Sequence, residues 1–250
     1  MTHFIIKKTF ELEFIRAATD NDLGGKAKSL SSMWINAGLH QLVLKTIMVS
    51  VSDTCIHSIR QYINPAGKVM FMVDEYLTPI LDGLNVRTQI TATTSCTQIP
   101  RIGYKFYLSK DLSDVEWYGS GPWNSYSDRC VSAYLGIYNL PISKLFDNYA
   151  NPQENGNRSN VRWVKITSKC NQLIEIVGHK LFNFSYSPYE VMDMHVAMHP
   201  YDLKIQPFNI LHIDACMAPV GNASCGPQAM EKYQVGDGIY NLSFDIFFRK

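Results

Sequence analysis

Short runs of β-branched and aromatic residues, bounded by glycine, proline, asparagine or aspartate, follow one another through most of this chain. Such runs are typical of β-strands, whose side chains pack on a pleated surface and whose ends need turns. Residues 1–14 alternate apolar and polar side chains and predict a first strand. Further strands are predicted at residues 42–51, 55–63, 68–76, 84–93, 102–108, 162–167, 173–178, 209–215 and 239–248. We therefore expect an all-β protein that begins as an antiparallel meander.

Helical segments are scarce. The clearest one is expected to begin at Ser187, with Glu190 completing a capping box, and to end at His199 before a proline. Shorter helices are expected at residues 28–37 and 141–148. A few short helices at the margins of the strands do not change the fold class.

Composition narrows the classes of partner. With 250 residues, of which 46% are hydrophobic, the chain can bury a core as one large domain or two small ones. A net charge of +1 offers no clustered positive charge for nucleic acid or an anionic membrane. No secretion signal is visible, and no apolar stretch approaches the roughly 18 residues of a membrane span. We expect a soluble protein, cytoplasmic or periplasmic.

Metal binding finds little support. The six cysteines are scattered without a Cys-x-x-Cys pair, so most are expected to be small buried hydrophobic residues. Asp20-Asn-Asp resembles the start of a calcium loop, but Ser31 stands where the twelfth-position glutamate belongs, which favours a polar turn. His195 and His199 share one face of the predicted helix, and a solvated surface pair is favoured over a metal site.

Two segments, residues 117–129 and 152–163, combine turn-forming residues with tryptophan, tyrosine, aspartate, glutamate and arginine. Each is expected to be a long shaped loop, and the aromatic side chains suggest contact with a sugar ring. Core packing is favoured for Trp117, whereas Trp123 is equally compatible with exposure on a loop.

Hydrolytic chemistry has few candidates. The chain has no Gly-x-Ser-x-Gly elbow and no phosphate-binding glycine loop. Glu116, which directly precedes the first segment, and Glu154, within the second, are the only glutamates to consider as catalytic acids. A structural role is favoured for both, as acceptors of hydrogen bonds from Arg129, Arg158 or loop amides, because a buried carboxylate must be paired.

Nine ordered motifs together resemble a known family. They are Arg16-Ala-Ala-Thr-Asp-Asn-Asp, Arg101-Ile-Gly, Glu116-Trp-Tyr-Gly-Ser-Gly-Pro, Tyr126-Ser-Asp-Arg, Pro152-Gln-Glu-Asn-Gly-Asn-Arg, Val161-Arg-Trp, Phe184-Ser-Tyr-Ser-Pro-Tyr, His199-Pro-Tyr-Asp-Leu and Ser224-Cys-Gly-Pro. The set resembles the C-terminal domain of the β-galactosidases of glycoside hydrolase family 2, which also occurs as a separate small chain. The resemblance covers residues 14–248 and implies one domain over residues 1–250, a β-supersandwich with the galactose mutarotase-like fold.

The resemblance also implies which parts of the enzyme carry the catalytic residues and the metal ions. The two catalytic glutamates lie on a separate barrel domain, so no catalytic residue is expected here. Magnesium and sodium are bound largely outside this domain, so no cofactor is expected in this chain. The implied partners are the remaining domains or the large subunit of a β-galactosidase and a β-galactoside, and self-association stays open.

The implied role of the domain is to wall the active-site pocket with a loop. In some relatives this loop presents a tryptophan, and here the aligned residue is Cys225, which offers no aromatic platform. Substrate contact is expected at Asn222, Ser224 and Cys225. Further candidates are Trp123, Glu154 and Arg158.

A rival hypothesis is a free-standing carbohydrate-binding or mutarotase-like domain. A mutarotase needs a glutamate and a histidine placed together over the sugar, and Glu154 has no convincing histidine partner in the sequence. Fold resemblance alone does not establish such an activity. If the chain instead packs against missing domains, an exposed apolar patch is expected where they dock.

Overall fold

The computed structural model describes residues 6–24, 29–96, 98–221 and 226–249, and strands dominate them. The strands are β1 Ile6–Glu13, β2 Val43–Val51, β3 Ile56–Ile63, β4 Val69–Ile80, β5 Gly83–Ala92, β6 Arg101–Leu108, β7 Leu112–Gly121, β8 Tyr134–Pro141, β9 Arg158–Ser168, β10 Leu173–Ser187, β11 Asn209–Met217 and β12 Gly238–Arg249. The α-helices are α1 Asp20–Leu23, α2 Leu30–Asn36 and α3 Val191–Val196. The prediction of an all-β protein with a few short helices is confirmed.

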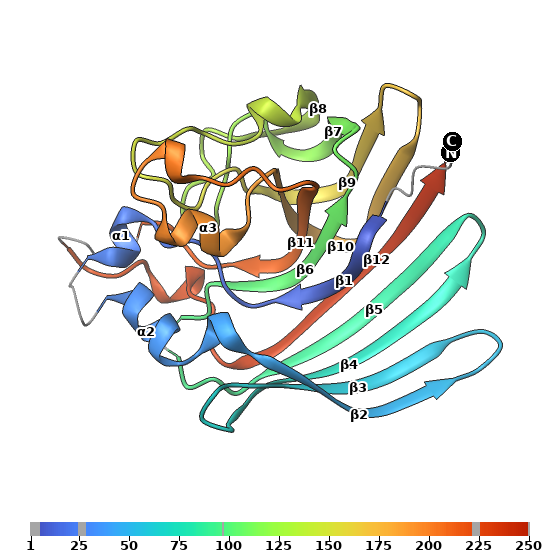
Figure 1. Ribbon diagram of the computed structural model, residues 1–250, viewed down its shortest axis with the longest axis horizontal. Helices are drawn as coiled ribbons and strands as arrows, with labels where there is room; N and C mark the ends of the chain where they lie inside the picture. The colour runs from blue at the N-terminus through green and yellow to red at the C-terminus, as the bar shows by residue number, and fades with distance from the viewer. Residues whose placement is uncertain (1–5, 25–28, 97, 222–225, 250) are drawn as a thin grey trace.

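Within the described ranges, twelve strands form one branched antiparallel sheet (Figure 1). The branch lies at β10, which pairs with β9 along one edge. On its other edge, the first half of β10 pairs with β12 and the second half with β11. Three arms leave this point, in the orders β11-β6-β1, β12-β5-β4-β3-β2 and β9-β7-β8. The sheet curls, so that one of its faces encloses the core.

The core follows from the alternation of side chains along the strands. In β5, for example, Val86 and Ile90 point inward and are fully buried. Aromatic contacts join distant arms, since Phe14 stacks on Phe71 with ring centroids 3.7 Å apart. Helix α2 closes one end of the core with the buried Trp34, whose Nε1 donates to a backbone carbonyl at 2.9 Å.

Strand β6 is buried on both faces, unlike the outer strands. Ile102, Tyr104 and Phe106 belong to the core cluster, and the alternate residues Arg101 and Lys105 therefore point to the opposite side. A Cβ on Gly103, between those two, would lie 2.0 Å from Oδ1 of Asp214 in β11. The strand thus separates the apolar core from a second, polar layer.

The two segments expected to be long loops are only partly loops. Residues 117–121 belong to β7 and residues 158–163 to β9, so that part of the prediction is wrong. The glycines in the first segment do not all mark turns. A Cβ on Gly119 would lie 2.9 Å from Cα of Val161, so this glycine permits β7 and β9 to approach closely.

The helix predicted from Ser187 to His199 is shorter than expected. Ser187 still pairs with Ile210 in the ladder of β10 and β11, so it is not available as a helix cap, and the predicted capping box is wrong. Helix α3 begins after Glu190 without a side-chain cap. It ends before His199, so His195 and His199 do not share a helix.

The smaller helix predictions have mixed outcomes. Helix α2 confirms the one at residues 28–37, and its N-cap Ser29 accepts a bond from the backbone of Ser32. Residues 141–148 form only the 3₁₀ turn Ile142–Lys144. The turn expected at Asp20 is the short helix α1, capped by Thr19. In the described residues, every helix is too short or too polar to cross a membrane.

The prediction that most cysteines are buried is also wrong for the part of the chain that is described. Cys130 and Cys170 are exposed, whereas Cys55, Cys96 and Cys216 are half-buried. All five are free thiols. Cys96 and Cys216 pack against the hydrophobic core from its edge.

Candidate functional site

A layer of charged and polar side chains lies on the face of the sheet that points away from the core. Alternation along neighbouring strands brings these side chains together. They are Glu13 from β1, Arg101 and Lys105 from β6, Ser185 from β10, and His212 and Asp214 from β11. Residues 146–156 and 185–203 border the space above them, which has a volume of about 20 Å³. This is room for about one water molecule.

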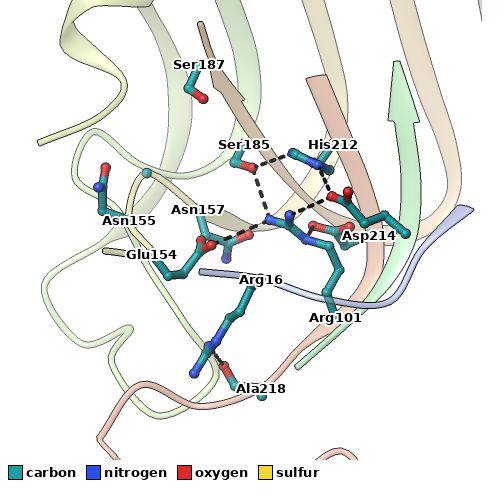
Figure 2. Close-up of polar contacts among 12 residues, drawn as sticks. Arg16, Arg101, Glu154, Asn155, Asn157, Ser185, Ser187, His212, Asp214 and Ala218 are labelled. Carbon is teal, nitrogen blue, oxygen red and sulfur yellow. Dashed lines mark hydrogen bonds and ion pairs between the residues drawn. The ribbon is translucent and has the colours of Figure 1, made fainter. Parts of the chain in front are cut away.

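Arg101 is the centre of this layer, and Figure 2 shows Ser185, His212 and Asp214 around it. Its guanidinium nitrogens lie 3.3 Å from Asp214, 3.5 Å from Glu13 and 3.8 Å from Glu154. Burial would lower the pKa of Arg101, but the three carboxylates outweigh burial and raise it. One cation is therefore shared by three buried carboxyl groups.

Glu13 is the ionised member of the layer. Its Oε2 lies 2.7 Å from Nε2 of His212, and its Oε1 accepts a bond from Nζ of Lys105 at 2.7 Å. Burial acts to raise the pKa of Glu13, but the His212 bond and the neighbouring cations together lower it. Burial also lowers the pKa of His212 to about 4, so a neutral imidazole donates to the carboxylate at neutral pH.

Asp214 and Glu154 behave in the opposite way. Burial raises the pKa of both carboxyl groups, that of Asp214 to about 7, although the charge of Arg101 opposes the change. The oxygens of Asp214 have no aligned hydrogen bond among the described residues and rely on the ion pair with Arg101. Asp214 is therefore the member of the layer that changes charge near neutral pH.

The proton on Asp214 leads to a pH-dependent stability. The folded state keeps this proton up to about pH 7, whereas the unfolded state releases it near 3.8. The resulting stabilisation is complete below pH 3.8 and is lost as the pH rises to about 7. Because Asp214→Asn stays neutral, its effect on the free energy of unfolding should be more favourable at pH 8 than at pH 5, by about 2–3 kcal/mol.

Urea unfolding at the two pH values measures this difference for Asp214→Asn. The exposed Asp111→Asn serves as the control, and its two values should agree within about 0.5 kcal/mol. Equal effects of Asp214→Asn at pH 5 and pH 8 would show that Asp214 is ionised throughout this range.

A second feature lies beside the polar layer, where residues 218–221 lead into residues 222–225. Arg16 donates to the carbonyl oxygens of Ala218 at 2.6 Å and Pro219 at 2.9 Å. The same guanidinium forms a fully buried ion pair with Asp22 at 2.8 Å. Asp22 in turn closes the capping box of α1 with Thr19. The first motif of the chain thus holds this segment from one side.

Two other side chains hold the end of the segment. Nδ2 of Asn21 donates to the carbonyl oxygen of Val220 at 2.8 Å. The carboxylate of Asp128 accepts bonds from the backbone N–H of Val220 at 3.1 Å and of Gly221 at 2.7 Å. Residues 218–221 are therefore fixed by contacts from two distant parts of the chain. We call residues 218–221 the anchored segment.

A cleft of about 290 Å³ lies at the end of the anchored segment. Its walls include Asn21, Tyr126, Asp128, Glu154 and Gly221. The structure therefore brings Glu154 to the same cleft as the end of the anchored segment.

The predicted site residues have different outcomes. Glu154 accepts a bond from the hydroxyl of Tyr126 at 3.1 Å, and its side chain is 2% exposed. Its partners are thus Tyr126 and Arg101, not the expected arginines at positions 129 and 158. The expected residues Asn222, Ser224 and Cys225 lie outside the described residues.

Arg158 and Trp123 do not line the cleft. Arg158 is buried and donates to the carbonyl oxygens of Leu145, Gly156 and Pro122, so it braces loops. Burial lowers its pKa to about 10. Trp123 is 68% exposed, which answers the question left open by the sequence.

Several residues of the site were not singled out from the sequence. Arg101, Asn21 and Asp128 stand within motifs whose individual side chains had no assigned role. His212 and Asp214 alternate with Leu211 and Ile213 in a predicted strand. A histidine and an aspartate on one face of a buried strand were the sequence signal for a polar site. Buried charges need partners, so such a pair indicates that other polar groups lie nearby.

The fold and the contacts around residues 218–221 define the chain as an antiparallel all-β domain in which two distant motifs hold a largely buried segment. The chain belongs to the β-galactosidase small chain family, since residues 2–246 match the family described as "Beta galactosidase small chain".

Similar proteins include β-galactosidases from several organisms. The protein from Actinobacillus pleuropneumoniae is 27% identical over 98% of this chain and 24% of its own length. That from Lactobacillus delbrueckii subsp. bulgaricus is 30% identical over 91% of this chain and 22% of its own length. The chain therefore spans about a quarter of the length of these relatives.

Similar solved structures include a galactose mutarotase-like protein from Lactobacillus casei. It has 13% identity and a TM-score of 0.46, covering 81% of this chain and 72% of that chain. A galactose mutarotase related enzyme from Lactobacillus acidophilus has 7% identity and a TM-score of 0.48, covering 98% and 84%.

Proposed function

We propose that this chain forms the small-chain part of a β-galactosidase and completes the wall of a galactoside pocket. The observation that carries the proposal is the anchored segment, which is held by Arg16, Asn21 and Asp128. Fixing the base of a loop lowers the entropy lost when the loop orders against a substrate. The family match and the length of the relatives support a role inside a larger enzyme.

The chemistry itself is assigned to the rest of that enzyme, which we propose to be a retaining glycosidase of glycoside hydrolase family 2. Retention needs two carboxyl groups about 5 Å apart that face a sugar and water. Here Glu13, Glu154 and Asp214 surround Arg101 beside a space of about 20 Å³, too small for a sugar ring. The nucleophile, the acid/base and the bound magnesium and sodium belong to the part outside the matched region.

The same geometry argues against the rival mutarotase-like function. His212 does lie in the layer with Glu154, but its Nε2 is directed to Glu13. Glu154 lines the cleft of about 290 Å³ but His212 does not, and the space of about 20 Å³ that both groups line is too small for a sugar ring. A mutarotase needs this pair to reach the sugar.

Complementation tests the proposal. The purified chain is mixed with the matching barrel-containing polypeptide from the same organism, and hydrolysis of a chromogenic β-galactoside is followed. Neither part alone should be active, whereas the mixture should be. Asp128→Ala releases two backbone N–H groups at the base of the loop and should lower kcat/KM of the mixture by about 10–100-fold. The exposed Asp111→Ala is the matched control and should leave kcat/KM unchanged.

Two results would contradict the proposal. One is hydrolysis by this chain alone that Glu154→Gln abolishes, because the catalytic acid would then lie here. The other is a mixture in which the two polypeptides bind each other but hydrolyse no β-galactoside at any substrate concentration. Catalysis of galactose mutarotation, followed by polarimetry, would instead support the rival function.

A further inference from the structure

Strand β2 exposes a row of large apolar side chains. It forms the outer end of the arm β12-β5-β4-β3-β2, with β3 as its neighbour in the sheet (Figure 1). Six of its nine residues are large apolar side chains that are 38% to 71% exposed: Val43, Leu44, Ile47, Met48, Val49 and Val51. Edge strands of stable proteins are usually short, charged or covered, because an open apolar edge promotes association.

Both faces of β2 are open, in addition to its edge. Successive side chains point to opposite faces of a strand, and Met48 and Val49 are consecutive and both exposed. Lys45 is the only charged residue in the strand. The core of this chain therefore covers neither face, and covering them would remove a continuous apolar surface from water.

A second copy of the chain fits this surface poorly. Pairing of two β2 strands edge to edge would extend the sheet in its own plane and leave both faces of each strand in water. The register of β2 against β3 also shifts between Thr46 and Met48, which marks a bulge or irregularity. Bulges twist an edge and interrupt regular pairing with another strand. The partner must therefore be a protein surface that packs over the faces of β2.

We propose that β2 is a docking strand for the part of the β-galactosidase that lies outside the region matched by this chain. The strand would bind in an uncharged apolar groove on that part. The inference rests on the proposed function. The relatives carry about three quarters of their length outside the matched region, which supplies a body large enough to cover both faces. In Figure 1 the β2–β3 hairpin points away from α1, so this contact is separate from the anchored segment.

Affinity measurements test the assignment. The double variant Leu44→Lys/Val49→Lys places two charges on exposed positions of β2, and circular dichroism checks that the fold is kept. Titration calorimetry with the same barrel-containing polypeptide should give a Kd at least 10-fold higher than for the unchanged chain, because the charges would be buried on docking. Activity at saturating concentration of the variant should be unchanged. Leu81→Lys, at a position that is 86% exposed in the β4–β5 turn, is the matched control.

The outcomes separate this inference from the proposed function. Unchanged affinity of the double variant in an active mixture would overturn the docking strand and leave the proposed function intact. Weakened binding in a mixture that never hydrolyses the galactoside would support the docking strand and contradict the function. A dimer of the free chain in sedimentation experiments that the double variant dissociates would overturn the inference in favour of a second copy. Absence of any binding by the unchanged chain would overturn both.

Discussion

Replacing Arg101 with methionine is expected to lower the free energy of unfolding by about 3–5 kcal/mol. Arg101 is 1% exposed and lies between the carboxyl groups of Glu13, Glu154 and Asp214. Methionine replaces the aliphatic stem of Arg101 but not its guanidinium, so the carboxyl groups lose their shared cation. Urea unfolding at pH 7 measures the loss.

A rescue experiment shows whether the loss comes from the uncompensated carboxylates. The triple variant Arg101→Met/Glu154→Gln/Asp214→Asn removes two of the three carboxyl groups with the cation and should recover part of the stability. Arg249→Met is the control, because this arginine is 53% exposed in its contact with Glu175 and should contribute at most about 1 kcal/mol. If the triple variant is less stable than Arg101→Met, the carboxylates are not the source of the loss.

Replacing Trp117 with alanine is expected to destabilise the fold by about 3–5 kcal/mol. The indole is fully buried at the branch of the sheet, with its ring centroid 5.7 Å from that of Phe184 in β10 and 5.4 Å from that of Tyr138 in β8. Its Nε1 donates to the carbonyl oxygen of Ser120 at 3.1 Å. Alanine would leave a cavity between β7, β8 and β10 and would remove the bond to the carbonyl oxygen of Ser120.

Trp123 offers a matched control six residues away. Because this side chain is 68% exposed on a loop, Trp123→Ala should change the free energy of unfolding by less than about 0.5 kcal/mol. Both variants are measured by thermal unfolding, and Trp117→Ala should show the much lower Tm. Similar Tm values for the two variants would mean that the β7–β10 packing contributes little.

The positions of most strands could be predicted from the sequence. Strand β2 was expected at residues 42–51 and β11 at residues 209–215, close to their observed bounds. Their β-branched residues and flanking turns are local signals. The exceptions were β7, whose glycine-rich end was expected to be a loop, β8, for which no strand was predicted, and the second half of β10. Gly119 lies in a strand because Val161 approaches it closely, which is a contact between residues 42 positions apart.

The site could be predicted only in part. The motif that begins at Arg16 was identified, but its target at residues 218–221 was not, since about 200 residues separate the partners. Glu154 was expected to pair with Arg129, Arg158 or loop amides, and its partners are Arg101 and Tyr126 instead. Arg101 reaches it only because β6 and the loop before β9 meet across the polar layer.

The sequence by itself determined the fold class, most strands and, through its motifs, the β-galactosidase small chain resemblance. Alternation, turn residues and motif spacing are properties of neighbouring residues, so they are visible without a structure. The tertiary structure alone decided that Arg101 is shared by three carboxyl groups, that Arg16, Asn21 and Asp128 fix one segment, and that β2 is uncovered. Each depends on strands distant in the sequence becoming neighbours in the sheet, which local patterns do not encode.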